Sequence, residues 1–252
     1  MLAEIYEHHI LDHTYATLSI LGFNLPVTRH LAMMWLACVL LLVLVPAIFH
    51  STSKILAPAR NLLEGLVVFV RDEIVLVNLG PGSEGYTPYF CTLFTFILIC
   101  NGIGLVPFGA TATGNISVTA GLAFTTFALI LFSGIRKNGL VHYVATLVPH
   151  GVPKVLYPLL FPIEVLGLFT KTLALCIRLF ANMIGGHFAL LTIIGLIFIF
   201  GGMGHIVAGV TVLAAVPMAL FITLLEVLVV FLQAYVFTVL TAIFTGMAMN
   251  PH

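Results

Sequence analysis

Charged side chains are scarce in this sequence. Only 7% of its 252 residues are Asp, Glu, Lys or Arg, whereas about a quarter are charged in an average soluble protein. The 9 basic and 9 acidic residues give a formal net charge of zero, so the chain has no positive surface for binding nucleic acid. With 61% hydrophobic residues and a mean hydropathy of +1.20, the composition predicts a protein that crosses a membrane several times.

Motifs that bind metals, cofactors or nucleotides are also missing. The sequence has no H-E-x-x-H and no G-x-S-x-G, and the TKT tripeptide at 170–172 lacks the glycine loop of a nucleotide site. These absences argue against a membrane-embedded hydrolase and against an ATP site, and we expect no cofactor. The cysteines lie in apolar runs without C-x-x-C spacing, and we interpret them as small hydrophobic residues: Cys38, Cys91, Cys100 and Cys176.

The N-terminal segment, residues 1–30, has three acidic residues where a signal peptide would have a basic stretch. We therefore expect membrane insertion to depend on the internal helices. The histidines of this segment, His8, His9 and His13, include a pair four residues apart, but no second cluster accompanies them. A surface group is favoured over a metal site.

Long apolar runs dominate the rest of the chain. Spans are predicted at 31–49, 89–106 and 116–135, and the segments 154–200 and 206–248 follow. In the segment 51–79, charged residues alternate with apolar ones, which predicts an amphipathic helix lying at the membrane interface. The glycines and prolines of the loop at 78–88 then break the chain.

The last two segments are too long for upright spans. Each apolar run, 157–200 and 206–248, is roughly 43 residues long and would extend about 65 Å as a helix, against a hydrocarbon core of about 30 Å. Four short spans are the alternative, but the only strong breaker is GGMG at 201–204. We favour two long, steeply tilted helices that form a hairpin. The expected fold is one all-α membrane domain, residues 1–252, with about five membrane-embedded helices and one interfacial helix.

The basic residues predict the orientation. Counting five crossings, the loops that contain them all fall on one side, which places the N-terminus outside and the C-terminus inside. The residues that decide this are Lys54, Arg60, Arg71, Arg136, Lys137 and Lys154.

A few polar side chains interrupt the apolar runs. Glu164, Lys171 and Arg178 are seven residues apart, so each lies only about 20° from the last around a helix. Ionisable groups inside a bilayer usually mark an ion path, although a static ion pair between Lys171 and Glu164 is an alternative. His187, nine residues after Arg178, should face a different neighbour. The full set is Asn101, Glu164, Lys171, Arg178, Asn182, His187, Glu226 and Gln233.

These residues stand in recognisable motifs. The run RLFANMIGGH at 178–187, with PIEVLGLFTKTLAL before it and LEVLVVFLQAYVFTVLTAIF after it, resembles subunit a of the F-type ATP synthase. NGIGLVPF at 101–108 resembles a motif of the same family, and HHILDH at 8–13 also looks like family members. The resemblance is close from residue 89 onward and looser over 1–88.

The resemblance implies a non-catalytic proton-channel subunit. In that family the tilted hairpin lies against a rotating ring of small two-helix proteolipid c subunits, and Arg178 matches the arginine that faces the ring carboxylates. Asn101, His187 and Glu226 match the outer half-channel, and Glu164 the inner one. Asn182 and Gln233 match residues that position groups near Arg178, and we place Lys171 in the same proton-translocating set. The implied partners are the ring, peripheral-stalk b subunits, the lipid bilayer and, indirectly, the soluble F1 head.

One expectation depends on the family pattern alone. In many bacterial members a carboxylate matches His187 and a histidine matches Glu226, so we expect these two side chains to meet across the hairpin.

The location and the function each have an alternative. A start at Met1 without a transit peptide leads us to expect a bacterial plasma membrane rather than a mitochondrial inner membrane. A secondary ion-coupled transporter is the alternative function, but such transporters usually show internal repeats, and none is evident here.

Overall fold

The computed structural model describes residues 14–20, 23–51, 53–105, 111–146, 156–202 and 204–250. Five helices are long and apolar enough to cross a membrane. They are α2 (Arg29–His50), α5 (Thr87–Gly104, preceded by the 3-10 turn η2, Glu84–Tyr86), α6 (Ile116–Asn138), α8 (Tyr157–Gly201) and α9 (His205–Met249). The predicted all-α membrane fold is therefore confirmed. The predicted histidine cluster at 8–13 and Lys154 lie outside the described residues.

A short β-hairpin precedes the first span. Strands β1 (Thr14–Ile20) and β2 (Phe23–Thr28) pair antiparallel, with Ile20 opposite Phe23. The sequence analysis did not predict these strands, and they are the only strands in the described residues. The hairpin leads directly into α2, where the Thr28 hydroxyl accepts a hydrogen bond from the Leu31 amide at 3.4 Å and caps the helix.

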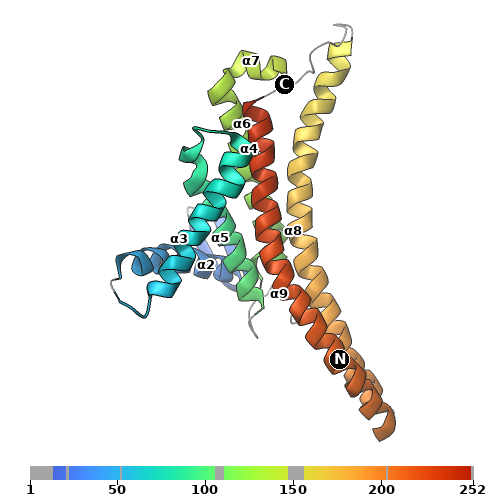
Figure 1. Ribbon diagram of the computed structural model, residues 1–252. Helices are drawn as coiled ribbons and strands as arrows, with labels where there is room; N and C mark the ends of the chain where they lie inside the picture. The colour runs from blue at the N-terminus through green and yellow to red at the C-terminus, as the bar shows by residue number, and fades with distance from the viewer. Residues whose placement is uncertain are drawn as a thin grey trace.

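The segment predicted as an interfacial helix forms a helix that begins at Ala57. It consists of α3 (Ala57–Phe69), the π-helix η1 (Val70–Leu76) and α4 (Val77–Leu79), and it ends at Gly80, whose φ is 88°. Its charged residues are exposed or half-buried, while Val70, Ile74 and Val75 are buried. Figure 1 shows α4 alongside the C-terminal half of α9, with which it is in contact. Its depth relative to the membrane remains a prediction.

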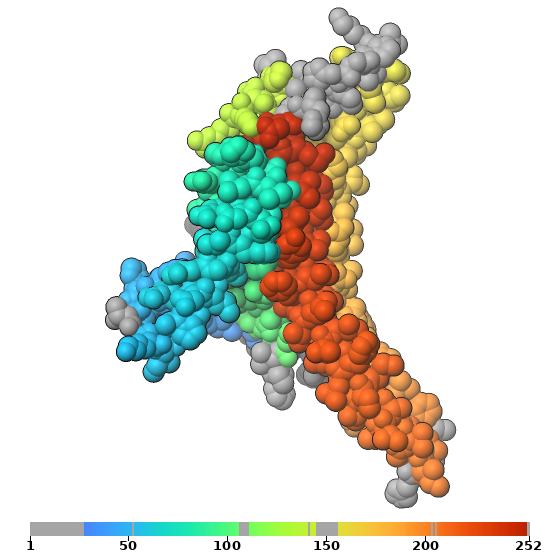
Figure 2. Space-filling model, in the orientation of Figure 1, coloured from blue at the N-terminus to red at the C-terminus, as the bar shows by residue number. Residues whose placement is uncertain are grey.

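The two long helices at the end of the chain are confirmed as an unbroken hairpin. Each has 45 residues, so the alternative of four short spans is excluded. Helix α8 ends at Gly201 and α9 begins at His205, and just before α9 Gly204 adopts a φ of 127° that favours glycine. Both helices bend, and the end of the hairpin projects beyond the other helices (Figures 1 and 2). The inclination of the hairpin to the bilayer remains a prediction.

The main core joins this hairpin to the segment η1 and to α5. Side chains from all four elements pack together. At the edge of this core, the ring of buried Phe94 meets the ring of exposed Phe231 edge to face, with the ring centres 5.8 Å apart. The buried members of this main core include Val70, Ile74, Phe90, Phe94, Ile97, Leu175, Leu179, Ala234, Phe237 and Ala242.

A small helix, α7 (Leu140–Thr146), follows α6 and was not predicted.

The C-terminal end of α9 is held by the end of α6. Lys137 donates a hydrogen bond from Nζ to Asn250 Oδ1 at 2.5 Å, and Asn138 donates from Nδ2 to the carbonyl oxygens of Ala248 and Met249. The last carbonyls of a helix have no partner within the helix, so these contacts satisfy them. They hold α9 in a defined register against α6.

Candidate functional site

Arg178 lies in the middle of α8 with its side chain exposed. It makes no hydrogen bond or ion pair with any other residue in the described part of the chain. Leu173, Ile177 and Asn182 are exposed near it on α8. Within about 60° of Arg178 around the helix, several other exposed residues are small: Ala174, Ala181 and Gly185. Small residues allow another helix to approach closely in a membrane. The arginine therefore points out of this subunit across a surface that a second helix can approach.

His187 and Glu226 meet across the α8–α9 hairpin. The distance from His187 Nδ1 to Glu226 Oε1 is 3.4 Å, which confirms the expectation that the two side chains meet. Glu226 reaches this position because Gly186 has no side chain: a β-carbon at Gly186 would lie 2.5 Å from Glu226 Oε1. The glycine before the histidine thus creates the space for the carboxylate.

A cavity of about 240 Å³ surrounds this pair. Asn101, Asn182, His187 and Glu226, four of the eight residues singled out in the sequence, line it. Asn101 on α5 is fully buried, and its Oδ1 accepts a hydrogen bond from Thr113 Oγ1 at 2.6 Å. Its Nδ2 has no partner among the described residues. Because a buried amide donor in a roomy cavity is normally satisfied by water, the arrangement suits a hydrated space.

Two residues outside the predicted set complete this site. Thr111 Oγ1 lies 3.2 Å from His187 Nε2, and the carbonyl oxygen of Thr111 accepts a hydrogen bond from His30 Nδ1 at 2.8 Å. Neither residue was selected from the sequence, because a threonine in a loop and a histidine at the start of a span have many ordinary roles. The only available signal was the concentration of hydroxyl groups in TATG at 111–114.

The other predicted residues lie outside the cavity. Lys171 places its ammonium group 5.7 Å from the centre of the Phe244 ring on α9, a cation–π distance. Glu164 is half-buried on the first half of α8, and no ion pair joins it to Lys171, since both residues are described and neither is paired. Gln233 is buried on α9 and makes no hydrogen bond to Arg178 in the described structure. The static ion pair considered from the sequence is therefore absent.

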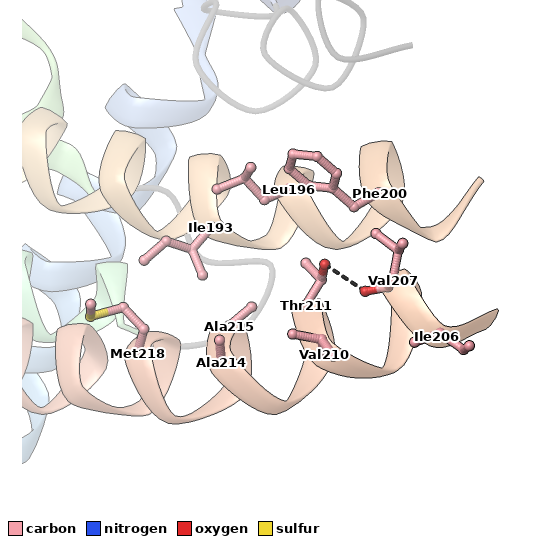
Figure 3. Close-up of a pocket in the computed structure, with 10 residues that line it drawn as sticks. All are labelled: Ile193, Leu196, Phe200, Ile206, Val207, Val210, Thr211, Ala214, Ala215 and Met218. Atoms are coloured by element: carbon pink, nitrogen blue, oxygen red, sulfur yellow. Dashed lines mark hydrogen bonds between the residues drawn. The ribbon is translucent and has the colours of Figure 1, made fainter. Parts of the chain in front are cut away.

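A larger pocket near the tip of the hairpin has a different character. It has a volume of about 670 Å³ and lies between the ends of α8 and α9. Figure 3 shows its apolar lining, which includes Ile193, Phe200 and Met218. Its one hydroxyl, on Thr211, donates to the carbonyl oxygen of Val207 in the same helix at 2.8 Å. With no titratable group, this pocket cannot carry a proton, so the candidate site is the smaller cavity.

Metal binding finds no support in the described ranges. Within them, no three His, Cys, Asp or Glu side chains gather as a metal site requires. The candidate site is therefore built from one exposed cation, one imidazole–carboxylate pair and several neutral polar groups.

Comparison with known proteins places these residues in a family. The family model described as ATP synthase A chain matches residues 31–246. The chain is 43% identical to ATP synthase subunit a of Chloroherpeton thalassium over 257 aligned residues, which cover 96% of this chain and 75% of the relative. It is 42% identical to ATP synthase subunit a 2 of Chlorobaculum tepidum, with 97% and 72% covered. It is 46% identical to the Anaeromyxobacter dehalogenans subunit a, with 89% and 58% covered. This chain, with its exposed arginine on α8 and its histidine–glutamate pair across the hairpin, belongs to the ATP synthase A chain family.

Proposed function

We propose that this chain is the proton-translocating stator subunit of an F-type ATP synthase. The observation that carries the proposal is the environment of Arg178, a permanent cation in the middle of a long apolar helix. Its side chain is exposed and has no partner in the described chain. A charge at this depth costs from about 3 to more than 10 kcal/mol unless a counter-charge is present. A carboxylate on another subunit would supply that counter-charge.

The moving partner is a ring of two-helix c subunits that each present one carboxyl group. The face of α8 around Arg178 supports this partner, because its small residues leave room for a passing helix. Arg178 attracts each ring carboxylate in its ionised form and separates an outer from an inner half-channel. A carboxylate must take up a proton before it can leave the arginine for the lipid. Proton entry and ring rotation are thereby coupled.

The cavity at His187 and Glu226 forms the outer access route. An imidazole and a carboxylate at hydrogen-bond distance can pass a proton from water toward the ring. Asn101 and Asn182 supply polar groups to the same cavity. Glu164, half-buried on the first half of α8, serves the inner route, and Lys171 and Gln233 lie on the two helices between the routes.

The chain itself binds no ATP and performs no covalent chemistry. One elementary charge that crosses 100 mV supplies about 2.3 kcal/mol, so several protons must pass for each ATP that the F1 head makes. Peripheral-stalk b subunits would hold this chain still while the ring turns. The multi-pass fold belongs in a membrane, and we propose the bacterial plasma membrane, with the mitochondrial inner membrane as the alternative.

The test is Arg178→Ala in the whole complex. We expect an assembled complex with no proton-driven ATP synthesis, measured in inverted membrane vesicles energised by an electron donor. Arg60→Ala is the matched control, because Arg60 is a half-buried cation outside the spans, paired with Glu64 at 3.6 Å. Normal synthesis by the Arg178→Ala complex would overturn the proposal. Native purification adds a second test: a chain that runs without small proteolipids would favour the secondary transporter.

A further inference from the structure

The loop between α5 and α6 reaches the proton site through one hydroxyl group. Thr111, with 3% of its surface exposed, is followed by the 3-10 turn η3 (Ala112–Gly114). This turn contacts α2, α5, α6 and α8. Thr111 Oγ1 lies 3.2 Å from His187 Nε2, on the side of the imidazole opposite Glu226. Both ring nitrogens of His187 therefore have partners, and Thr111 provides one of them.

Two neighbours hold Thr111 in place. His30 Nδ1, in the first turn of α2, donates a hydrogen bond to the Thr111 carbonyl oxygen at 2.8 Å. On the other side, Gly104 of α5 leaves the space that the threonine side chain occupies, since a β-carbon at Gly104 would lie 1.8 Å from Thr111 Oγ1. The backbone and the side chain of Thr111 are thus fixed by different helices.

A hydroxyl group suits this place because His187 must change its proton count. When Glu226 is ionised and His187 is neutral, Nδ1–H donates to the carboxylate, and Nε2 accepts a hydrogen bond from the Thr111 hydroxyl. When His187 is protonated, Nε2–H becomes a donor and the same hydroxyl oxygen accepts it. A hydroxyl can do both by rotation, whereas a carbonyl could only accept and an ammonium could only donate.

We infer that Thr111 and His30 are positioning residues of the proton pathway: Thr111 orients His187 in both of its protonation states, and His30 holds Thr111. The inference rests on the proposed function and extends it to a loop and to α2. It assigns α2, which lies at the edge of the molecule (Figure 1), a link to the α8–α9 site through His30, Thr111, His187 and Glu226.

The experiment compares Thr111→Ser with Thr111→Val in the assembled complex. Serine keeps the hydroxyl, and valine keeps the shape without it. We expect valine to lower ATP-driven proton pumping, and passive proton conduction after removal of F1, by about tenfold per assembled complex, as for the loss of one hydrogen bond to a group that becomes charged. Serine should recover most of the rate. A merely structural threonine would respond oppositely, because valine would preserve the packing. Pumping by Thr111→Val at the parental rate would overturn the inference.

A glycine pair in α5 tests the same contact without altering Thr111. Gly104→Ala should displace the hydroxyl and slow conduction, whereas Gly102→Ala should not, since a β-carbon at Gly102 would meet no atom within 4 Å. Equal rates for these two variants would contradict the inference, even if Thr111→Val failed to assemble. His30→Gln, which can still donate a hydrogen bond to the carbonyl, should conduct better than His30→Leu.

A double-variant comparison separates this inference from the proposed function. If Thr111 acts through His187, adding Thr111→Val to His187→Phe should cause no further loss of conduction. Independent, multiplying losses would overturn the link between the two residues. If Arg178→Ala supports normal ATP synthesis and Glu226→Gln pumps protons at the parental rate, the proposed function itself fails. If Arg178→Ala makes no ATP and Glu226→Gln pumps slowly while Thr111→Val is fully active, only the role of Thr111 fails.

Discussion

The carboxylate of Glu226 on α9 fills the space that a side chain at Gly186 on α8 would need. A β-carbon on Gly186 would lie 2.5 Å from Oε1, 3.1 Å from Cγ and 3.2 Å from Cδ of Glu226. The carboxylate reaches His187 because the residue before that histidine has no side chain. A glycine on α8 thus determines the position of a charge on α9.

We therefore predict that Gly186→Ala slows proton pumping by about tenfold or more, because a displacement of about 1 Å at a reacting group can be that costly. Adding Glu226→Asp, which shortens the side chain by one methylene, should recover part of the rate. The control is Gly121→Ala on α6, where a β-carbon meets nothing within 4 Å. ATP-driven acidification of inverted vesicles, normalised to assembled complex, measures all four proteins. An unimpaired Gly186→Ala complex would contradict the steric argument.

His187 and Glu226 should tolerate an exchange better than either single change. His187→Glu or Glu226→His alone places two like groups together, while the double exchange restores one imidazole and one carboxylate. We expect the double variant to pump faster than both singles, and Glu226→Gln to assemble but pump slowly. If the pair only held the helices together, loss of either partner would instead reduce assembly, because one half-buried polar group would remain unpaired. Immunoblots of the membranes and pumping rates distinguish these outcomes.

Arg178→Lys should fail although it keeps the positive charge. A lysine can lose its proton in a desolvated site, and it lacks the planar group that binds a carboxylate through two parallel hydrogen bonds. We expect ATP synthesis below about a tenth of the parental rate, with the complex assembled. Synthesis at the parental rate would mean that charge alone is sufficient. The measurement is ATP formation in energised vesicles, with Arg60→Lys as the control.

Gly246 on α9 should be intolerant of a side chain for a structural reason. A β-carbon there would lie 2.1 Å from the Asn78 carbonyl oxygen, and a backbone atom of α4 cannot rotate away. Gly246→Ala should destabilise the packing of α4 on α9 by about 1–3 kcal/mol, the usual cost of overpacking. The expected result is faster proteolysis of the purified complex and less subunit in the membrane. Gly209→Ala, which meets no atom within 4 Å, should behave like the parent.

Asp72 provides a test of pH dependence outside the spans. Its hydrogen bonds with Arg71, at 2.7 and 3.2 Å, lower the pKa of the carboxyl group. A carboxyl group whose pKa is lower in the folded than in the unfolded protein stabilises the folded state at pH values above its unfolded-state pKa. This stabilisation is lost as the pH falls through the pKa of the folded state. Both side chains are well exposed, so the contribution is small.

The carboxyl titration itself is the sharper measurement. The sequence has only two aspartates, Asp12 and Asp72, so carboxyl-labelled aspartate gives two NMR signals, and Asp12→Asn assigns them. Arg71→Gln should raise the pKa of Asp72, and Arg60→Gln should leave it unchanged. An identical titration in the parent and in Arg71→Gln would contradict the contact.

Much of the fold could be predicted from local features of the sequence. Apolar runs of sufficient length located all five spans, and the absence of a strong breaker within the last two runs predicted the hairpin. This works because a backbone in lipid must satisfy its hydrogen bonds within each helix, so length and composition almost determine the element. The π-helix at 70–76 and the strands at 14–20 and 23–28 were missed. Whether a helical turn is α or π, and whether two short strands pair, depends on contacts with neighbouring segments. The periodicity of apolar residues in the sequence does not show these contacts.

The residues of the candidate site also fall into two groups, those that the sequence identified and those that only the structure identified. Arg178, His187 and Glu226 could be selected from the sequence alone, because ionisable groups are costly in lipid and stand out from apolar surroundings. Only the tertiary structure showed that Gly186 makes room for Glu226, and that Thr111 and His30 extend the pair toward α2. A glycine, a loop threonine and a histidine at a helix start are common residues. Their importance here comes from contacts across as many as 81 positions of the chain, and such contacts are created by the packing of the helices.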